Sequence, residues 1–577
     1  MMFILTNSID GIRKKNFYID TKPLIKKSDE TYYLFGELFN EDEIIQEINE
    51  GKFDSKKMLG EYILIRNIKN KKITIYNDIL NIERYYYFFN KGCFIVSDNF
   101  WRLINEIEVD EKNIDIQALK EMIFLHKSLN EKTYVDGVNE SSLSHNIEYD
   151  IKKETLSKIY KKRINYRPKA GLDYVKDIDQ GISELVCYIK KKFGDDVYSA
   201  IGLSGGLDSR IIPIYLDKYQ LDNYELFQIG EIKPNKITYS YDTYISQKIA
   251  QNHRKRLYVY DFKQGNMNYK LKIDAFYNPT RTSNAIKVID DVPDWDILLT
   301  GGYGTMVGGH VIFPGVNDAS SEELRDIILS ILGRFKKPQS FIERIKKTLV
   351  SKNGKGKRID RKSVPGILKK TEYYEIERKL DTYIAGLRDI GYDNFDIVMN
   401  YHLGISNKYG SFESLSGRKT AYSIYYPYVF EKTLNWENDC LFGRKLLVKL
   451  YNEIKSDVNI PGQYRSQYDL IDSFVVRRIQ NIKSYIQYLF RRTSLLYESW
   501  MQDESFNNIL NEMIDNPNPL LLEHIDFNLI RYTHLNSLVI ENLVKMNYIL
   551  NIIFEKKYLE EFGSLFHPES SNLEPIN

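Results

Sequence analysis

Apolar and polar residues alternate in different ways along the chain, and the pattern divides the chain into three parts. Up to about residue 110, short apolar runs are separated by turns, which is typical of strands joined as hairpins. Residues 60–66 and 72–76 show a period of two around the polar turn 67–71, as the arms of a hairpin do. The expected strands are residues 32–39, 60–66, 72–76, 85–89 and 93–97, and helices are expected at 41–48 and 116–125.

From about residue 172 to residue 310, apolar strands alternate with helices. The expected strands are residues 198–203, 225–229, 256–260 and 295–300, and the expected helices are 178–193, a helix from about 210, and 241–251. Helices between apolar strands predict a parallel sheet with both faces covered. Beyond residue 310 the pattern is mainly helical, with amphipathic helices expected at about 475–500, 503–515 and 527–563.

The most informative segment, Ser204-Gly205-Gly206-Leu207-Asp208-Ser209, joins an apolar strand to a helix. Adjacent glycines let the backbone approach a ligand closely, and the first N–H groups of a helix attract an anion. Asp208 would repel a bare phosphate, so we expect it to hold Mg²⁺ that bridges to phosphates. No Gly-Lys-Ser/Thr follows, so this is not a Walker A loop. The competing interpretation is a plain strand–turn–helix corner with a capping serine.

Three predicted strands end at the 204–209 loop, at Ile229 and at the glycine turn 300–302. Ligands of parallel sheets lie beyond the carboxyl ends of the strands, so these three segments could enclose one nucleotide. We expect phosphates at the 204–209 loop, adenine near Ile229, and ribose or phosphate near the second glycine turn at 300–302. The expected nucleotide-binding residues are Leu203, Ser204, Gly205, Gly206, Leu207, Asp208, Ser209, Ile229, Gly301 and Gly302.

Composition narrows the remaining possibilities. The 577 residues are enough for two or three domains, and the formal charge of +2 argues against a nucleic-acid or membrane-surface protein. The three cysteines are far apart and the histidines are scattered, which predicts a reducing, cytoplasmic environment and no zinc site. No apolar run reaches membrane-spanning length, and the first residues lack the features of a signal peptide.

The basic stretch 352–362 is interpreted as a solvated loop, with a lid over an anionic substrate as the alternative.

The order of these features resembles the asparagine synthetase-like family. In the front part, the segments that resemble family motifs are 35–40, 59–62, 77–87 and 95–98. The resemblance implies an antiparallel two-layer-sheet domain of the Ntn-hydrolase type, similar to glutamine amidotransferases. It then implies an α/β parallel-sheet ATP pyrophosphatase domain with a helical C-terminal region. The expected boundaries are 1–165, 172–475 and a helical extension at 476–577, with a polar connection at 165–171.

Two departures from the family bear on activity. The family's glutaminase uses a cysteine exposed by removal of the initiator Met, but here Met2 and Phe3 follow Met1, and the first cysteine is Cys93. We therefore expect no glutamine hydrolysis. The family's acidic motif after the third nucleotide strand is replaced by residues 300–310, which keep glycines but no carboxylates. Asp208 would then carry more of the metal, with help from Asp242 or the substrate, or the site is impaired.

A third segment partly supports catalysis. Residues 426–428 resemble the family's R-x-P-F-L-D turn without its Asp, and residues 443–448 and 459–461 resemble the stretch that follows. The resemblance implies that Lys445 neutralises the negative charge that develops when the acyl-adenylate is attacked. The alternative is a solvated lysine on a helix.

The leading hypothesis is an ATP-dependent, AMP-forming amide ligase without its own glutaminase activity. It would use ATP and Mg²⁺, with Asp208 and Lys445 as catalytic residues. Its partners would be a small-molecule or peptide carboxylate and an amine, as in a biosynthetic ligase or cyclase. The alternatives are a nucleotide-binding protein with impaired catalysis, an asparagine synthase that uses ammonia, a tRNA-modifying pyrophosphatase, and an interaction protein built on the helical tail.

Overall fold

The computed structural model describes residues 3–9, 12–107, 109–161, 173–203, 206–230, 241–261, 265–281, 285, 288–289, 293–302, 316–331, 370–405, 420–426, 428–433, 445–454, 504–530, 537–562, 565 and 574–575. Several predicted features lie outside these residues. They are the 165–171 connection, most of the 300–310 segment, the basic stretch 352–362, residues 443–444 and 459–461, and the helix expected at 475–500.

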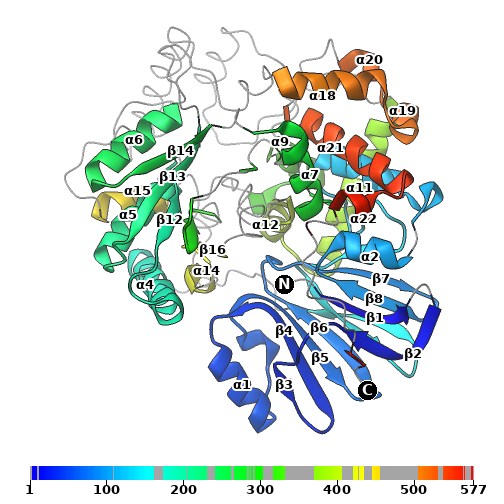
Figure 1. Cartoon of the computed structure of the whole chain (residues 1–577), viewed down its shortest axis with the longest axis horizontal. Helices are drawn as coiled ribbons and strands as arrows, with labels where there is room; N and C mark the ends of the chain where they lie inside the picture. The colour runs from blue at the N-terminus through cyan, green and yellow to red at the C-terminus, as the bar shows by residue number, and fades with distance from the viewer. Residues whose placement is uncertain are drawn as a thin grey trace.

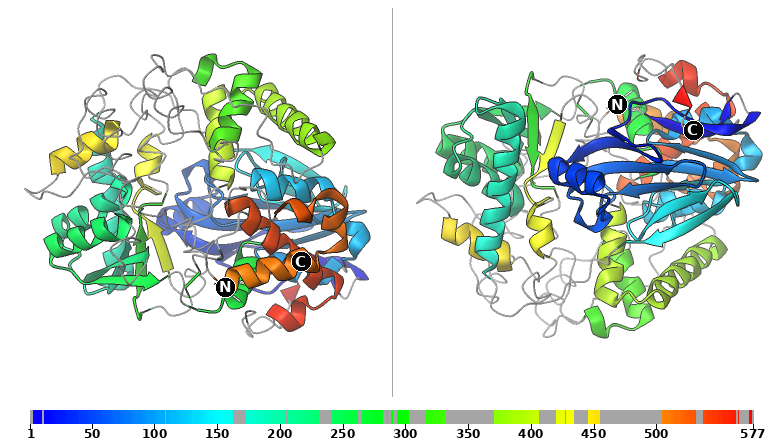
Figure 2. Two further views of the ribbon diagram at one scale, coloured as in Figure 1. Left: turned by 90° about the horizontal axis from the view of Figure 1, so that it is seen from above. Right: turned by 90° about the horizontal axis from the view of Figure 1, so that it is seen from below.

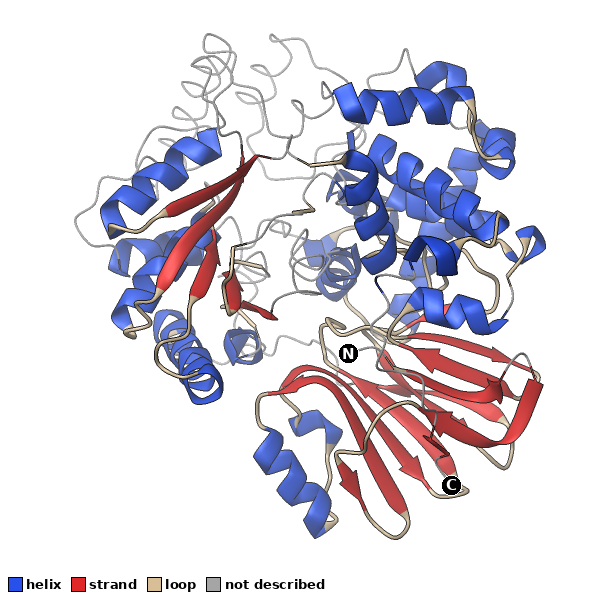
Figure 3. Ribbon diagram, in the orientation of Figure 1, coloured by secondary structure: helices blue, strands red, loops and turns tan. Residues whose placement is uncertain are grey.

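The N-terminal part of the chain forms most of two antiparallel sheets, at the lower right of Figures 1 and 3. In the described residues, the order of the first sheet is β17 (Glu574–Pro575), β2 (Ile12–Ile19), β1 (Ile4–Ile9), β8 (Cys93–Ser97), β7 (Tyr86–Asn90) and β9 (Val138–Glu140). The order of the second is β11 (Thr155–Tyr160), β10 (His145–Asp150), β6 (Lys72–Asn77), β5 (Gly60–Ile68), β4 (Glu30–Leu38) and β3 (Ile25–Lys26). The five strands predicted for this part are confirmed, with ends within about two residues.

The period of two in the sequence explains how the sheets pack. On β5, Ile63 and Ile65 enter the core between the two sheets, whereas Tyr62 and Leu64 face the opposite way, toward α1 (Glu41–Glu50). The first sheet behaves likewise, because Val96 joins the core between the sheets and Ile95 packs on the side of the helices. Those helices include α2 (Phe100–Ile107) and α3 (Ile116–Leu125). Two sheets are therefore enclosed between helical layers.

A parallel sheet follows, in the spatial order β14 (Leu257–Asp261), β13 (Tyr224–Gly230), β12 (Ser199–Gly202), β15 (Ile297–Thr300) and β16 (Thr420–Ser423). The accompanying helices are α4 (Tyr174–Phe193), α5 (Leu207–Lys218), α6 (Tyr241–His253), α14 (Tyr428–Thr433) and α15 (Lys445–Ile454). All four strands predicted for residues 172–310 are confirmed. Figure 2 shows this unit beside the antiparallel sheets. The coarse fold prediction, antiparallel sheets followed by a parallel sheet and helices, is thus confirmed.

The remaining described helices lie above the antiparallel sheets in the view of Figure 1. They are α7 (Met267–Tyr277), α9 (Ser321–Ile331), α11 (Lys370–Asp389), α12 (Asn394–Ile405), α18 (Glu504–Asp515), α19 (Pro519–His524), α20 (Phe527–Ile530), α21 (Ser537–Phe554) and α22 (Tyr558–Phe562). None of the helices in this described set combines the length and apolar character needed to cross a bilayer.

The prediction of one amphipathic helix over 527–563 is wrong. The segment forms the three helices α20, α21 and α22, and α21 packs against α3, α7, α18 and α22. Helices on several sides leave α21 little solvent-facing surface, so its apolar residues are spread around it instead of forming one stripe. The domain boundaries given above stay predictions.

Candidate nucleotide site at the end of the parallel sheet

The strand order of the parallel sheet defines a crevice. Numbered along the chain, the strands lie in the order 3-2-1-4-5, so the direction of winding reverses between β12 and β15. At such a reversal the connections leave in opposite directions, which opens a space beyond the carboxyl ends of the two strands. The predicted loop follows β12 and the second glycine turn follows β15, so the structure brings these two segments to one place.

The helix after the first loop begins earlier than the sequence predicts. Helix α5 begins at Leu207, not near Arg210, so Asp208 and Ser209 lie in its first turn. Gly206 occupies the N-cap position and, as a glycine, supplies no side-chain cap to this end. The hydroxyl of Ser209 donates to the carbonyl of Gly206, 3.3 Å away, inside the turn. A helix N-terminus with glycine at the N-cap position is a geometry suited to an anion.

Gly301 makes the closest approach between the two loops. A Cβ atom at this position would lie 3.1 Å from both the carbonyl carbon of Asp208 and the amide nitrogen of Ser209. The neighbours are backbone atoms, which cannot move aside as a flexible side chain can. Glycine at 301 is thus needed for the turn after β15 to lie against the first turn of α5.

Hydrogen bonds hold the neighbouring strand ends in place. Thr300 accepts from the amide of Ile424 at 3.1 Å, and its hydroxyl accepts from the amide of Gly302 at 3.1 Å. The hydroxyl of Ser423 donates to the carbonyl of Gly302. The ends of β15 and β16 are therefore fixed relative to each other and form a rigid border to the crevice.

Asp208 is the carboxylate of this site. Its side chain is half-buried in the first turn of α5, and its carbonyl oxygen accepts from the hydroxyl of Tyr425 at 2.9 Å. Burial, and then the nearby charge of Asp208, raise the pKa of Tyr425 well above its usual value, so the hydroxyl stays protonated and remains a donor.

In the described residues, no cluster of three or more His, Cys, Asp or Glu side chains is placed to hold a metal. Mg²⁺ bound with phosphates usually takes only one or two carboxylates from the protein, so a single carboxylate such as that of Asp208 is compatible with the predicted ion. The role of Asp208 in holding Mg²⁺ stays a prediction.

The structure describes only some of the other predicted site residues. Leu203 extends the strand pairing, because its amide donates to the carbonyl of Phe227 at 2.7 Å. Ile229 lies next to the end of β13 and is partly buried against the core, so a contact with adenine stays a prediction. Ser204 and Gly205 lie outside the described residues. Lys445 begins α15, which packs against α5, but its side chain is not described.

A carboxylate not singled out from the sequence joins the two sheet systems. Glu37 on β4 accepts from the hydroxyls of Tyr422 on β16 and Tyr188 on α4, at 2.7 and 3.1 Å. It also forms an ion pair with Lys192 at 2.5 Å. Nothing in the local pattern around Glu37 signals this role, since its partners lie more than 150 positions away.

Sequence reasoning also missed a polar cavity between the antiparallel sheets and the helical layer. Its walls include Lys127, Glu131 and the serine-rich stretch 141–145. The only available signal was the unusual run of polar residues at 139–146, which the pattern of strands does not require.

No family model matches the chain, and no curated protein matches it. Among solved structures, it is similar to the allosteric regulatory enzyme of purine biosynthesis, at 7% identity and a TM-score of 0.18, over 45% of this chain and 73% of that chain. Glutamine phosphoribosylpyrophosphate amidotransferase from B. subtilis, complexed with ADP and GMP, shows 9% identity and a TM-score of 0.18, over 52% and 75%. The U34-tRNA thiolase from Methanococcus maripaludis shows 16% identity and a TM-score of 0.17, over 43% and 85%. Scores this low do not establish a common fold.

Proposed function

We propose that this protein is an ATP-dependent amide-forming ligase that activates a carboxylate as an acyl-adenylate and releases pyrophosphate. The observation that carries the proposal is the N-terminus of α5, which has Gly206 at its N-cap position and lies at the reversal point of the parallel sheet, with Gly301 against its first turn. The front domain, in this proposal, is an amidotransferase-like fold of the Ntn-hydrolase type.

In the proposed reaction, a carboxylate oxygen of the substrate attacks the α-phosphorus of ATP, and the bond to the bridging oxygen of the β-phosphate breaks. Pyrophosphate leaves toward the first turn of α5, where the backbone N–H groups stabilise its charge. Asp208 would hold the Mg²⁺ that offsets the phosphate charge. An amine then attacks the acyl carbon, loses a proton, and displaces AMP. Lys445 is the proposed cation for the oxygen on which negative charge develops.

The amine is proposed to come from solution or from the substrate rather than from glutamine. Residues 3–9, which contain the first strand, include no cysteine, and Cys93 lies at the start of β8 in a hairpin opposite Asn90. A hairpin position paired in the sheet is not where the family's glutaminase carries its nucleophile.

The test measures pyrophosphate release from ATP and Mg²⁺ with a panel of carboxylic acids and amines, aspartate with ammonia included. We expect release with at least one pair and a loss of at least tenfold in Asp208→Ala. Asp222→Ala is the matched control, because Asp222 is exposed and lies two residues before the start of β13, at the opposite end of the sheet.

Each outcome separates one alternative. ATP binding by calorimetry without pyrophosphate release would favour a nucleotide-binding protein with impaired catalysis. Formation of asparagine from aspartate and ammonia would identify an ammonia-dependent asparagine synthase. Equal turnover in wild type and Asp208→Ala would remove Asp208 from the mechanism, and no heat from ATP with Mg²⁺ would overturn the proposal.

A further inference from the structure

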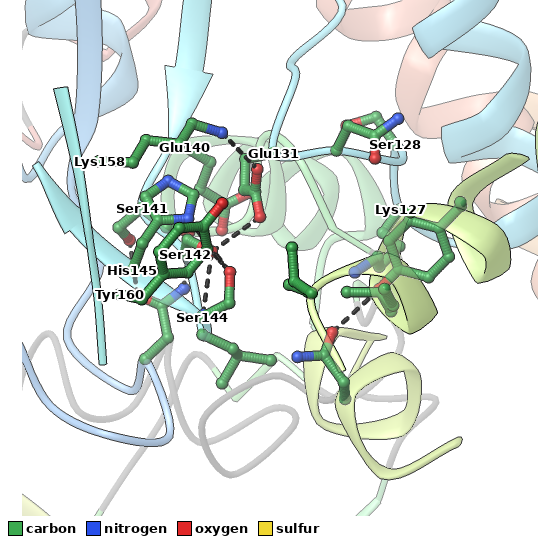
Figure 4. Close-up of a pocket in the computed structure, with 18 of the residues that line it drawn as sticks. Lys127, Ser128, Glu131, Glu140, Ser141, Ser142, Ser144, His145, Lys158 and Tyr160 are labelled. Atoms are coloured by element: carbon green, nitrogen blue, oxygen red, sulfur yellow. Dashed lines mark hydrogen bonds and ion pairs between the residues drawn. The ribbon is translucent and has the colours of Figure 1, made fainter. Parts of the chain in front are cut away.

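A cavity of about 210 Å³ lies between the antiparallel sheets and the helices α11 and α12 (Figure 4). One wall is formed by the segment after α3 and by residues 140–145, and the facing wall by α11 and α12. Its volume is on the order of that of seven water molecules in the liquid, so the space suits a ligand of a few heavy atoms.

Lys127 supplies an unmatched positive charge to this cavity. Its ammonium lies over the rings of Tyr383 and Tyr401, 5.5 and 5.7 Å from their centroids. Within the part of the chain that the structure describes, it forms no hydrogen bond or ion pair. The two other cations of the lining are matched, since Arg281 pairs with Glu140, and Lys158 with Glu131 at 3.5 Å.

The opposite wall is a chain of hydrogen bonds whose direction can be worked out. The hydroxyl of Ser142 donates to the carboxylate of Glu131 at 2.7 Å, because a carboxylate can only accept. Ser144, whose hydroxyl is 3.0 Å from that of Ser142, must then be the donor in that pair. The hydroxyl of Ser144 is therefore left to accept from Nδ1 of His145, 3.1 Å away.

The charge states of Glu131 and His145 agree with this assignment of donors and acceptors. Burial works to raise the pKa of Glu131, but the neighbouring positive groups and the hydroxyl of Ser142 outweigh it, so the pKa lies below the usual value and the group is ionised. Burial lowers the pKa of His145 to about 4, so its ring is neutral near pH 7. With the proton on Nδ1, Nε2 is an acceptor. The wall thus offers acceptors to a hydroxyl or amino group, as Figure 4 lets the reader follow.

The charges of the lining define the ligand. Three positive side chains and two carboxylates line the cavity, and Arg84 behind the lining shares Glu140 with Arg281. Among the lining cations, Lys127 is the one without an ion-pair partner in the described residues. A monoanion would match this charge, whereas a dianion such as phosphate would also face two carboxylates at close range.

We propose that this cavity binds a small polar monocarboxylate, of the size of a hydroxy acid or a small amino acid. The carboxylate lies at the ammonium of Lys127, and the hydroxyl or amino group lies toward the wall of Ser142, Ser144 and His145. None of the lining residues belongs to the loops of the nucleotide crevice, and the proposal does not depend on the proposed ligase activity.

The experiment titrates glycolate, glycine, ethylene glycol and inorganic phosphate into the full chain near pH 7, with calorimetry or ligand-observed NMR as the readout. We expect glycolate or glycine to bind at least tenfold more tightly than ethylene glycol and phosphate. Lys127→Met should weaken that binding at least tenfold. Lys132→Met is the matched control, since this lysine is in the same segment, is exposed and does not line the cavity.

A second variant keeps the test decisive if Lys127→Met does not fold. Asn400→Asp is nearly isosteric and adds a negative charge to the lining, next to the hydroxyl of Tyr383. It should also weaken binding at least tenfold. The proposal is overturned if neither monocarboxylate binds, if phosphate binds as tightly, or if a folded Lys127→Met or Asn400→Asp binds like wild type.

Discussion

Replacing Lys127 by methionine should stabilise the protein at neutral pH, although it removes a charged residue. Burial, followed by the nearby Arg281, lowers the pKa of Lys127 to about 8, even though Glu131 and Glu140 favour its charge. From the ordinary value of 10.5, this corresponds to a penalty of roughly 3 kcal/mol for the charged form in the folded state. Because Lys127 is only half-buried, solvent screening and the lost ring contacts reduce the expected gain in the free energy of unfolding to about 1–2 kcal/mol.

The dependence on pH gives the sharper test. Below pH 8 the lysine is charged in both states, so the folded state carries the full penalty. Between pH 8 and 10.5 the folded state loses its proton while the unfolded state still holds one, so the stability of wild type rises with pH relative to Lys127→Met. The assay is urea unfolding of both proteins at pH 7 and pH 10.

The expected result is an advantage of Lys127→Met at pH 7 that shrinks by pH 10. A variant less stable than wild type at pH 7, or a gap that does not change with pH, would refute the reasoning. Lys132→Met serves as control, because its ion pair with Asp115 is exposed and should contribute about 0–1 kcal/mol at either pH.

Three further predictions concern the nucleotide crevice, the contacts of Glu37 between the two sheet systems, and a buried ion pair in the helical part. Gly301→Val should lower the affinity for ATP at least tenfold in calorimetry, because its Cβ would lie 3.1 Å from backbone atoms of α5. Glu37→Gln should lower the free energy of unfolding in urea by about 1–3 kcal/mol, because a charged acceptor shared by two hydroxyls and a lysine is lost. Lys545→Met should cost about 3–5 kcal/mol in the same assay, because Asp274, fully buried and 3.3 Å away, loses its ion-pair partner.

Each of these has a matched control. Gly386→Ala adds a Cβ that meets nothing within 4 Å, so ATP affinity should not change. Asp42→Asn removes an exposed pair with Lys191, so stability should stay within about 1 kcal/mol. Combining Lys545→Met with Asp274→Leu should restore part of the lost stability, because no buried charge is then unpaired. A control that changes as much as its test variant would contradict the corresponding interpretation.

The elements were predictable wherever a local pattern reports burial. Ile63 and Ile65 alternate with Tyr62 and Leu64 because a strand turns successive side chains to opposite faces, and both faces of β5 are covered. The change from strand to helix around Gly206 was predictable because an apolar strand and a helical pattern lie on either side of it, whereas the nucleotide-binding role of the loop stays a prediction. Helix α21 was mispredicted because packing on several sides removes the amphipathic stripe that a sequence pattern can report.

The sequence by itself determined nine of the described strands and helices such as α1, α3, α4 and α6, since these depend on residues close together in the chain. Only the tertiary structure decided the strand order, and with it the approach of Gly301 to Asp208. The same holds for the cavity around Lys127, whose walls come from segments more than 200 residues apart. The physical reason is that burial and charge matching between distant segments are properties of the whole packed chain, whereas periodicity is a property of neighbours.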